Sequence, residues 1–399
     1  MEIQNKRAIP LSESDGEPTR LAASLTATPS ASIVAPLEAK PKGMRIHDLD
    51  GLRGIAAIAV VFYHYTTCYR DFFSYNAPLP FSFQYGMYGV QLFFLISGFV
   101  VLMSVERKRD PLDFAKSRFI RLYPAYWASL LFVVLLIALT PGPREFIGWG
   151  RLFRRAAADV SMVQGWFHIA SLSGTYWTLG LEMTFYVVVL LLLFYKKLDW
   201  IVPMLCGLVV IGAIDGLCCR YRPNPVSPWL RSALALDYIH YMLVGVLIYK
   251  MRETPRPAYV VVAVLSLFAT YTQDPARHEA GKELVVGAVL ALIVMLATNG
   301  RLGVLRWKVP VFLGAISYSL YLNHSVLGFH IIYNAQRYGL SPIVSIALAI
   351  AASIILATAT TFYFEKPVMA TLRRRFHSPP PSSTAPTPCG APSLLPSVG

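Results

Sequence analysis

The chain has 399 residues, of which 55% are hydrophobic and only 15% are charged, and its mean hydropathy is +0.50. A soluble domain usually carries about 25% charged residues, so this composition excludes an ordinary soluble protein and indicates one that lies in a lipid bilayer. The net charge of +14 does not indicate a nucleic-acid partner, because the basic residues lie in short loops between apolar runs.

The two ends of the chain differ from the rest. Residues 1–43 and 377–399 are rich in proline and small polar residues, so we predict disordered extensions around a folded membrane domain at residues 44–376. The first extension lacks the apolar segment of a secretory signal. The five cysteines show no metal-ligand spacing, and we expect neither a metal nor a tightly bound cofactor.

The apolar runs predict an all-α polytopic membrane protein, because a helix of roughly 20 apolar residues crosses a bilayer core of about 30 Å. About ten transmembrane helices are predicted, near residues 49–68, 86–104, 119–139, 176–195, 199–216, 232–250, 257–271, 284–298, 309–329 and 342–363. Lysine and arginine are roughly twice as frequent in the loops on the side of the two termini, which we therefore predict to be cytoplasmic. The loop 140–175 on the other side contains an amphipathic segment that is typical of a helix lying on the membrane surface.

Ionisable side chains within a span are costly and by default indicate function. The first span contains Arg53 and, eleven residues later, His64. Eleven residues of α-helix return to nearly the same face about 16 Å further along the axis, so both side chains can line one groove. The structural alternative is an arginine that extends to the membrane surface and a histidine bonded to a nearby carbonyl.

Glu182 lies in the fourth span and His324 in the ninth, and we expect both at the depth of His64, in the half of the membrane away from the cytoplasm. A carboxylate beside an imidazole can fix its tautomer and raise its basicity, as a general base requires. We therefore expect these three groups to meet in one site. The alternative is that they only hold helices together.

Arg118 and Arg121 are three residues apart at the cytoplasmic start of the third span, and Arg53 is expected at the same level. Guanidinium groups bind phosphate and pyrophosphate in a bidentate manner. The three arginines therefore predict an anion site at the cytoplasmic mouth of the groove, although membrane anchoring alone explains one or two of them.

Six sequence motifs in the same order resemble those of the acyltransferase 3 family, integral membrane enzymes that O-acylate surface glycans and some macrolides. The motifs are LDGLRGIAAIAVVFYH with Arg53 and His64, GVQLFFLISGF, RFIRLYPAYW with Arg118 and Arg121, YWTLGLEMTFY with Glu182, LGAISYSLYLNH with His324, and FEKP at Glu365–Pro367. The resemblance covers about residues 46–372. It is to the stand-alone type, without a fused hydrolase-like domain.

The chain departs from the family pattern at two positions. Gln91 and Met183 stand where the family often has acidic residues. Both positions vary in the family, so we expect these differences to bear on the choice of substrate more than on activity.

The resemblance implies a membrane-embedded O-acyltransferase of the bacterial inner membrane that uses cytoplasmic acyl-CoA, with acetyl as the expected acyl group. His64 would be the base or an acyl carrier, Glu182 would orient or stabilise the histidine, and His324 would complete the catalytic set. Arg53, Arg118 and Arg121 would hold the phosphates of acyl-CoA. The implied acceptor is a hydroxyl of an exported or lipid-linked glycan.

Several alternatives remain open at this point. The acceptor could be a small secondary metabolite such as a macrolide, and intramembrane His, Glu and Arg also form the proton relays of transporters. A membrane-bound O-acyltransferase of the other type would use Asn323 and His324 but would leave the Arg53 and His64 pattern unexplained. A scaffold without activity would not require aligned polar positions.

Overall fold

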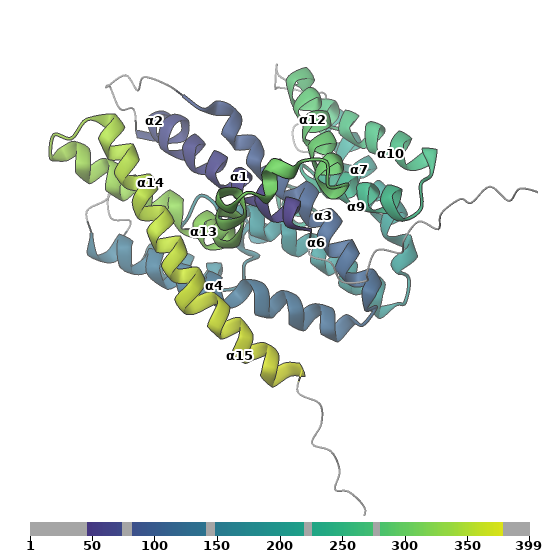
Figure 1. The fold of residues 1–399 in the computed structure, drawn as a ribbon, viewed down its shortest axis with the longest axis horizontal. Coiled ribbons are helices and arrows are strands. Elements are labelled where there is room, and N and C mark those ends of the chain that lie inside the picture. The colour runs from purple at the N-terminus through teal and green to yellow at the C-terminus, as the bar shows by residue number, and fades with distance from the viewer. Residues whose placement is uncertain (1–45, 74–81, 141–147, 219–225, 274–279, 378–399) are drawn as a thin grey trace, which may run out of the picture. The chain divides into compact units, whose positions relative to one another are not determined.

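The computed structural model describes residues 46–73, 82–140, 148–218, 226–273 and 280–377, and all regular structure within these ranges is helical (Figure 1). The α-helices are α1 (His47–Tyr63), α2 (Tyr69–Phe73), α3 (Gly89–Arg107), α4 (Pro111–Leu139), α5 (Trp149–Asp159), α6 (Trp177–Phe194), α7 (Ile201–Cys218), α8 (Pro228–Ala233), α9 (Ile239–Glu253), α10 (Pro257–Phe268), α11 (Thr270–Gln273), α12 (Ala280–Thr298), α13 (Lys308–Arg337), α14 (Pro342–Ala359) and α15 (Lys366–His377). Short turns of other helix types are η1 (His64–Cys68), η2 (Gln84–Tyr88), η3 (Gln164–Phe167), η4 (Leu198–Trp200), η5 (Gly303–Arg306) and η6 (Thr360–Glu365). The all-α prediction is confirmed, while the predicted extensions lie outside the described residues, except for His377 at the end of α15.

Six helical segments are long and apolar enough to cross a membrane, namely Gln84–Arg107, Pro111–Leu139, Trp177–Phe194, Leu198–Cys218, Gly281–Thr298 and Pro342–Phe376. Each falls on a predicted span. The other four predicted spans also fall on helices, but α1 and α9 have only 17 and 15 residues, α10 is short, and α13 contains the polar run SYSLYLNHS. The count of ten and the cytoplasmic location of the termini therefore remain predictions.

Two pairs of helices pack through glycines, α1 against α13 and α3 against α9. A Cβ atom on Gly314 would lie 1.9 Å from the carbonyl oxygen of Asp50, and one on Gly245 would lie 2.1 Å from that of Leu95. Small residues let helix backbones approach closely within a membrane, where no hydrophobic effect drives the helices together. These glycines therefore determine which helices are neighbours around the site.

The segment between α4 and α6 contains the predicted amphipathic helix, which is α5. Leu152 and Asp159 of α5 are buried, whereas Arg151, Phe153 and Arg154 are exposed. Hydrogen bonds anchor the end of this segment: Tyr126 Oη on α4 donates to the carbonyl of Asp159 (2.7 Å), and Trp166 Nε1 donates to the carbonyl of Gly180 on α6 (3.2 Å). The segment is thus attached to the helices that carry the site.

We predict that Gly245→Ala lowers the free energy of unfolding by about 1–3 kcal/mol, because the added methyl group forces α3 and α9 apart. Gly207→Ala on α7 is the matched control, since a Cβ atom there meets no atom within 4 Å. That change should be neutral or slightly stabilising, because alanine favours the helix over glycine. Thermal unfolding of both purified variants tests the prediction, and equal unfolding temperatures would contradict it.

Candidate active site

His64 lies where the first helix changes its winding. The α-helical part, α1, ends at Tyr63, and η1 continues it as a π-helical turn from His64 to Cys68. Such turns are rare and occur often at functional sites, since the extra residue per turn alters the direction of the side chains. A second π-helical turn, η6, ends at Glu365 of the FEKP motif.

His64 and His324 contact each other across the packed helices. His64 Nδ1 lies 3.3 Å from His324 Nε2 and 2.9 Å from the carbonyl oxygen of Val60. A carbonyl oxygen can only accept a hydrogen bond, so Nδ1 of His64 carries a hydrogen. The same reasoning applies to His324, whose Nδ1 lies 3.1 and 3.0 Å from the carbonyl oxygens of Leu320 and Tyr321.

These hydrogen bonds determine the tautomers of the neutral pair. His324 Nε2 has a free lone pair and accepts the hydrogen of His64 Nδ1, which is shared with the carbonyl of Val60. His64 Nε2 is then the unprotonated nitrogen of that ring. The pair therefore has one basic nitrogen, His64 Nε2, while the contacts of His64 Nδ1 hold the ring of His64 in place. This arrangement is suited to proton transfer.

Tyr65 holds His324 in place. Its hydroxyl donates to the carbonyl of His324 (2.8 Å) and accepts from Ser353 Oγ (2.6 Å), and both side chains are buried. The ring of Tyr65 fills the space beside Gly328, where a Cβ atom would lie 2.1 Å from it. Three helices, α1 with η1, α13 and α14, are thus joined at the histidine pair.

Asn323, next to His324, is linked to the segment that precedes α6. Its side-chain oxygen accepts a hydrogen bond from Ser129 Oγ (2.9 Å), and Ser129 also contacts the hydroxyl of Tyr176 (2.9 Å). All three residues are buried. Asn323 is therefore bonded to α4 and, through Ser129, linked to Tyr176 just before α6.

A cavity of about 220 Å³ lies beside His64, and we call it the histidine cavity. It is lined by Val60, Tyr63, His64, Cys68, Met87, Val90, Gln91, Gly174, Thr175, Trp177, Tyr238 and Tyr321. Among these described lining residues there is no lysine, arginine, aspartate or glutamate. The cavity therefore suits an uncharged ligand.

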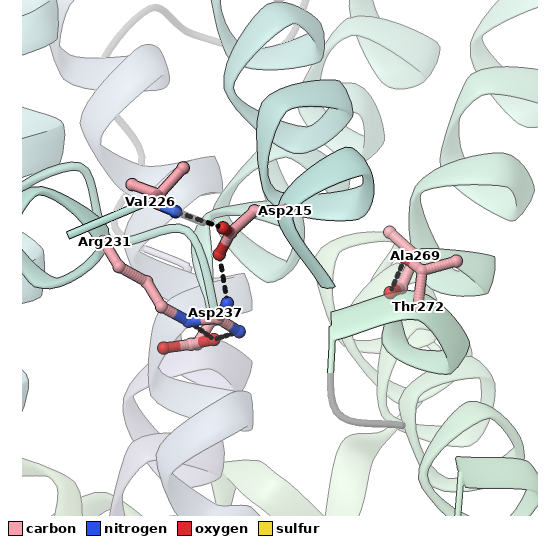
Figure 2. Close-up of polar contacts among 6 residues, drawn as sticks. All are labelled: Asp215, Val226, Arg231, Asp237, Ala269 and Thr272. Carbon is pink, nitrogen blue, oxygen red and sulfur yellow. Dashed lines mark hydrogen bonds and ion pairs between the residues drawn. The ribbon is translucent and has the colours of Figure 1, made fainter. Parts of the chain in front are cut away.

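The wall formed by Tyr238 is supported by an ion-pair network at the ends of α7, α8 and α9 (Figure 2). Arg231 on α8 pairs with both Asp215 and Asp237, and Asp215 also accepts a hydrogen bond from the backbone amide of Val226 (3.0 Å). Only 1% of the Asp215 side chain is exposed, so its charge needs this compensation. The network holds the turn that leads directly to Tyr238.

Glu182 does not pair with His64. Its carboxylate accepts hydrogen bonds from Ser97 Oγ on α3 (2.8 Å) and from the hydroxyl of Tyr186, one turn along α6. The expectation that Glu182 orients the ring of His64 is therefore wrong in this structure, in which Val60 and His324 hold that ring. Glu182 faces α3 because α6 packs against it there.

Glu182 lines a second, smaller cavity of about 70 Å³, together with Arg53 and Arg121, which we call the arginine cavity. Its other lining residues are Val90, Phe93, Phe94, Ser97, Leu122, Thr178, Leu179, Ser317, Tyr318 and Tyr321. Two guanidinium groups and one carboxylate leave the cavity with an excess of positive charge. It can therefore bind an anionic group.

Arg118 lies outside the lining of the arginine cavity. Its guanidinium donates to Ser104 Oγ and stacks near the rings of Phe114 (5.3 Å) and Tyr186 (5.4 Å). Through Tyr186 it is one contact removed from Glu182. The structure thus brings two of the three predicted arginines together and places the third behind the cavity wall.

Several residues at the site were missed by the sequence reasoning. Ser97 and Tyr186 bind Glu182, Tyr65 holds His324, and Ser319 Oγ donates to Glu365 (2.9 Å). The spacing of four residues between Glu182 and Tyr186 was a usable signal, since such pairs are neighbours on a helix. The other contacts join different helices and have no signal in one sequence.

The two cavities share Val90 and Tyr321 as lining residues. The hydroxyl of Tyr321 lies 2.8 Å from Thr178 Oγ1, and its ring meets that of Phe93 edge to face. Tyr321 is thus part of the wall between the arginine cavity, which has an excess of positive charge, and the histidine cavity, which is lined by the basic residue His64. The arrangement can hold two substrates of different charge on the two sides of one residue.

Comparison with known proteins gives consistent matches. A family model described as an acyltransferase domain matches residues 46–362. The chain is 26% identical to the exopolysaccharide production protein ExoZ of Rhizobium meliloti, over 73% of this chain and 92% of that protein. It is 27% identical to the acyltransferase MdmB of Streptomyces mycarofaciens, over 87% of this chain and 97% of that protein. It is 30% identical to the O-acetyltransferase OatA of Staphylococcus aureus over 35% of this chain and 23% of that protein. No solved structure matches the chain.

We predict that Tyr65→Phe lowers the free energy of unfolding by about 1–3 kcal/mol, because the carbonyl of His324 and the hydroxyl of Ser353 both lose a buried partner. The double variant Tyr65→Phe/Ser353→Ala should lose less than the sum of the two single changes, with a coupling of about 0.5–3 kcal/mol. Unfolding of the four purified proteins tests this. Strict additivity would contradict the hydrogen bond between the two side chains.

Proposed function

The chain belongs to the acyltransferase 3 family and is a membrane O-acyltransferase, and we propose that it transfers an acetyl group from acetyl-CoA to a hydroxyl of an exported glycan. The name of one relative, an exopolysaccharide production protein, supports this acceptor class, and that of another, an O-acetyltransferase, supports the acetyl group. The proposed location is the bacterial inner membrane, with acetyl-CoA supplied from the cytoplasm.

The histidine pair carries the proposal. His64 Nδ1 is committed to Val60 and His324, which leaves Nε2 as the nitrogen that can take a proton, on a residue that lines a cavity. A general base must be unprotonated, held in one orientation and within reach of its substrate. We propose that His64 Nε2 is this base and that His324 supports it.

The proposed reaction balances without a further reactant. The acceptor hydroxyl gives its proton to His64 Nε2 while its oxygen attacks the thioester carbonyl carbon. The carbon–sulfur bond then breaks, and the thiolate of CoA leaves with the proton from His64. While His64 is doubly protonated, His324 Nε2 and the carbonyl of Val60 accept from its Nδ1, which stabilises the imidazolium.

The arginine cavity supports the proposed donor site. Arg53 and Arg121 would bind the phosphates of acetyl-CoA, and Glu182 would keep these guanidinium groups positioned and limit their mutual repulsion. Arg53 and His64 lie about 16 Å apart along their helix. The donor would therefore span the two cavities, with its charged end among the arginines and its thioester near His64.

We predict that His64→Ala lowers acetyl transfer by at least about 100-fold, because general-base catalysis contributes about 10²–10⁴-fold. His330→Ala is the matched control, since His330 also bonds a carbonyl one turn back but lines neither cavity. Mass spectrometry of the surface glycan from a deletion strain that carries each variant measures the acetyl content. Normal acetylation by His64→Ala would exclude this residue as the base.

We predict that Arg121→Gln weakens acetyl-CoA binding by about tenfold or more, because a charge-assisted hydrogen bond to phosphate contributes about 1.5–3 kcal/mol. Arg118→Gln is the comparison and should have a smaller effect, since Arg118 lies behind the cavity wall. Calorimetric titration of the purified proteins with CoA and with dephospho-CoA measures both effects. If Arg118 mattered more than Arg121, the arginine cavity would not be the donor site.

A further inference from the structure

Gln91 on α3 has a buried side-chain oxygen without a hydrogen-bond partner among the described residues. Only 6% of Gln91 is exposed, and the residue lines the histidine cavity. A buried polar atom left unpaired costs about 1–3 kcal/mol, and most such atoms in proteins are paired. An oxygen in this position is explained if a ligand in the cavity donates to it.

The walls of the cavity indicate what kind of ligand this is. Trp177 and Tyr238 lie side by side with ring centroids 5.2 Å apart, and both line the cavity. Trp177 is 40% exposed, so this wall reaches the surface of the described part of the chain. Aromatic faces pack against apolar C–H surfaces, while the Gln91 oxygen needs a donor such as a hydroxyl.

Charge separates the two cavities. The arginine cavity has three charged lining residues, Arg53, Arg121 and Glu182, whereas the described lining of the histidine cavity has no acidic residue, lysine or arginine. An anionic donor and an uncharged acceptor would therefore bind on different sides of Tyr321.

We propose that the histidine cavity binds one pyranose ring of the acceptor, with Gln91 Oε1 accepting a hydrogen bond from a ring hydroxyl and Trp177 packing against the ring face. The ring is held beside His64, so a neighbouring hydroxyl of the same sugar lies within reach of the base. Gln91 thereby selects which hydroxyl is presented. This inference rests on the proposed function, since it assigns the acceptor site of that reaction.

Binding of a panel of methyl glucopyranoside, galactopyranoside and mannopyranoside to the purified protein tests the inference, with saturation-transfer NMR as the measurement. At least one of the three should bind saturably to the parent protein. Gln91→Met keeps the length of the side chain without its oxygen and should weaken that binding at least tenfold. Gln91→Glu keeps an acceptor oxygen and should retain binding to within about threefold. Loss of binding by this variant would exclude a hydrogen bond from a sugar hydroxyl to the side chain at position 91.

Gln164→Met is the matched control, because Gln164 also has a buried, unpaired side-chain oxygen but does not line the cavity. It should leave pyranoside binding unchanged, and an equal loss would show that the effect of Gln91 is not local. Unfolding temperatures of all variants establish that they fold. Trp177→Leu should also weaken pyranoside binding, because it removes the aromatic face against which the ring packs. The inference is overturned if no pyranoside binds the parent protein or if Gln91→Met binds normally.

The same proteins separate this inference from the proposed function. If pyranoside binding depends on Gln91 but His64→Ala still acetylates the glycan, the base assignment fails and the sugar site stands. If acetylation depends on His64 but pyranosides bind independently of Gln91, the sugar site fails and the proposed reaction stands.

Discussion

The site depends on the close packing of α1 against α13. A Cβ atom on Gly54 would lie 2.5 Å from the backbone nitrogen of Gly314, and one on Gly314 would lie 1.9 Å from the carbonyl of Asp50. Larger residues at these two positions would push the helices apart. The two imidazoles would then be too far from each other to form a hydrogen bond. The glycines thus permit His64 and His324, 260 positions apart in the sequence, to meet at 3.3 Å.

An ion pair supports the same packing at one end of α1. Arg306 in η5 contacts both carboxylate oxygens of Asp48, which is buried at the start of α1. The chain enters α13 directly after η5, so this pair fixes the register of the two helices where they begin to run together. Tyr65 and Ser353 add α14 at the level of the histidines. The position of the histidine pair is therefore fixed by the packing of α1, α13 and α14. The Asp48–Arg306 ion pair stabilises this packing at the start of α1, and the Tyr65–Ser353 hydrogen bond stabilises it at the level of the histidines.

Much of the fold follows from properties that run along the sequence. Apolar runs determine where helices lie, and counting residues from the end of a helix gives the depth of a side chain. For this reason His64 and His324 were expected at the same depth, and the structure brings them together. Glu182 was expected there too, but it contacts Ser97 on α3.

The failure at Glu182 has a physical cause. Depth is set along the helix axis, whereas the neighbour of a side chain also depends on the rotation of its helix and on which helices stand beside it. The rotation of a helix and its neighbours are set by packing between distant segments, such as Gly98 against Met242. A single sequence does not reveal such packing. Arg118 and Arg121 show the same limit, because a spacing of three residues still leaves about 60° between their directions. That angle separates a residue in the cavity from one behind its wall.

The two cavities give the proposed reaction a geometric requirement. A donor with its phosphates at Arg53 and its thioester near His64 has to pass Tyr321, whose hydroxyl bonds Thr178 and whose ring contacts Phe93. The hydrogen bond contributes only about 0.5–1.5 kcal/mol net, which is small beside the binding energy that two guanidinium–phosphate contacts can supply. In the proposed reaction, the binding energy of the donor would therefore suffice to displace the Tyr321 side chain. The backbone carbonyl oxygen of Tyr321 also accepts a hydrogen bond from His324 Nδ1 (3.0 Å). The residue between the two cavities is therefore in contact with the histidine that supports the proposed base.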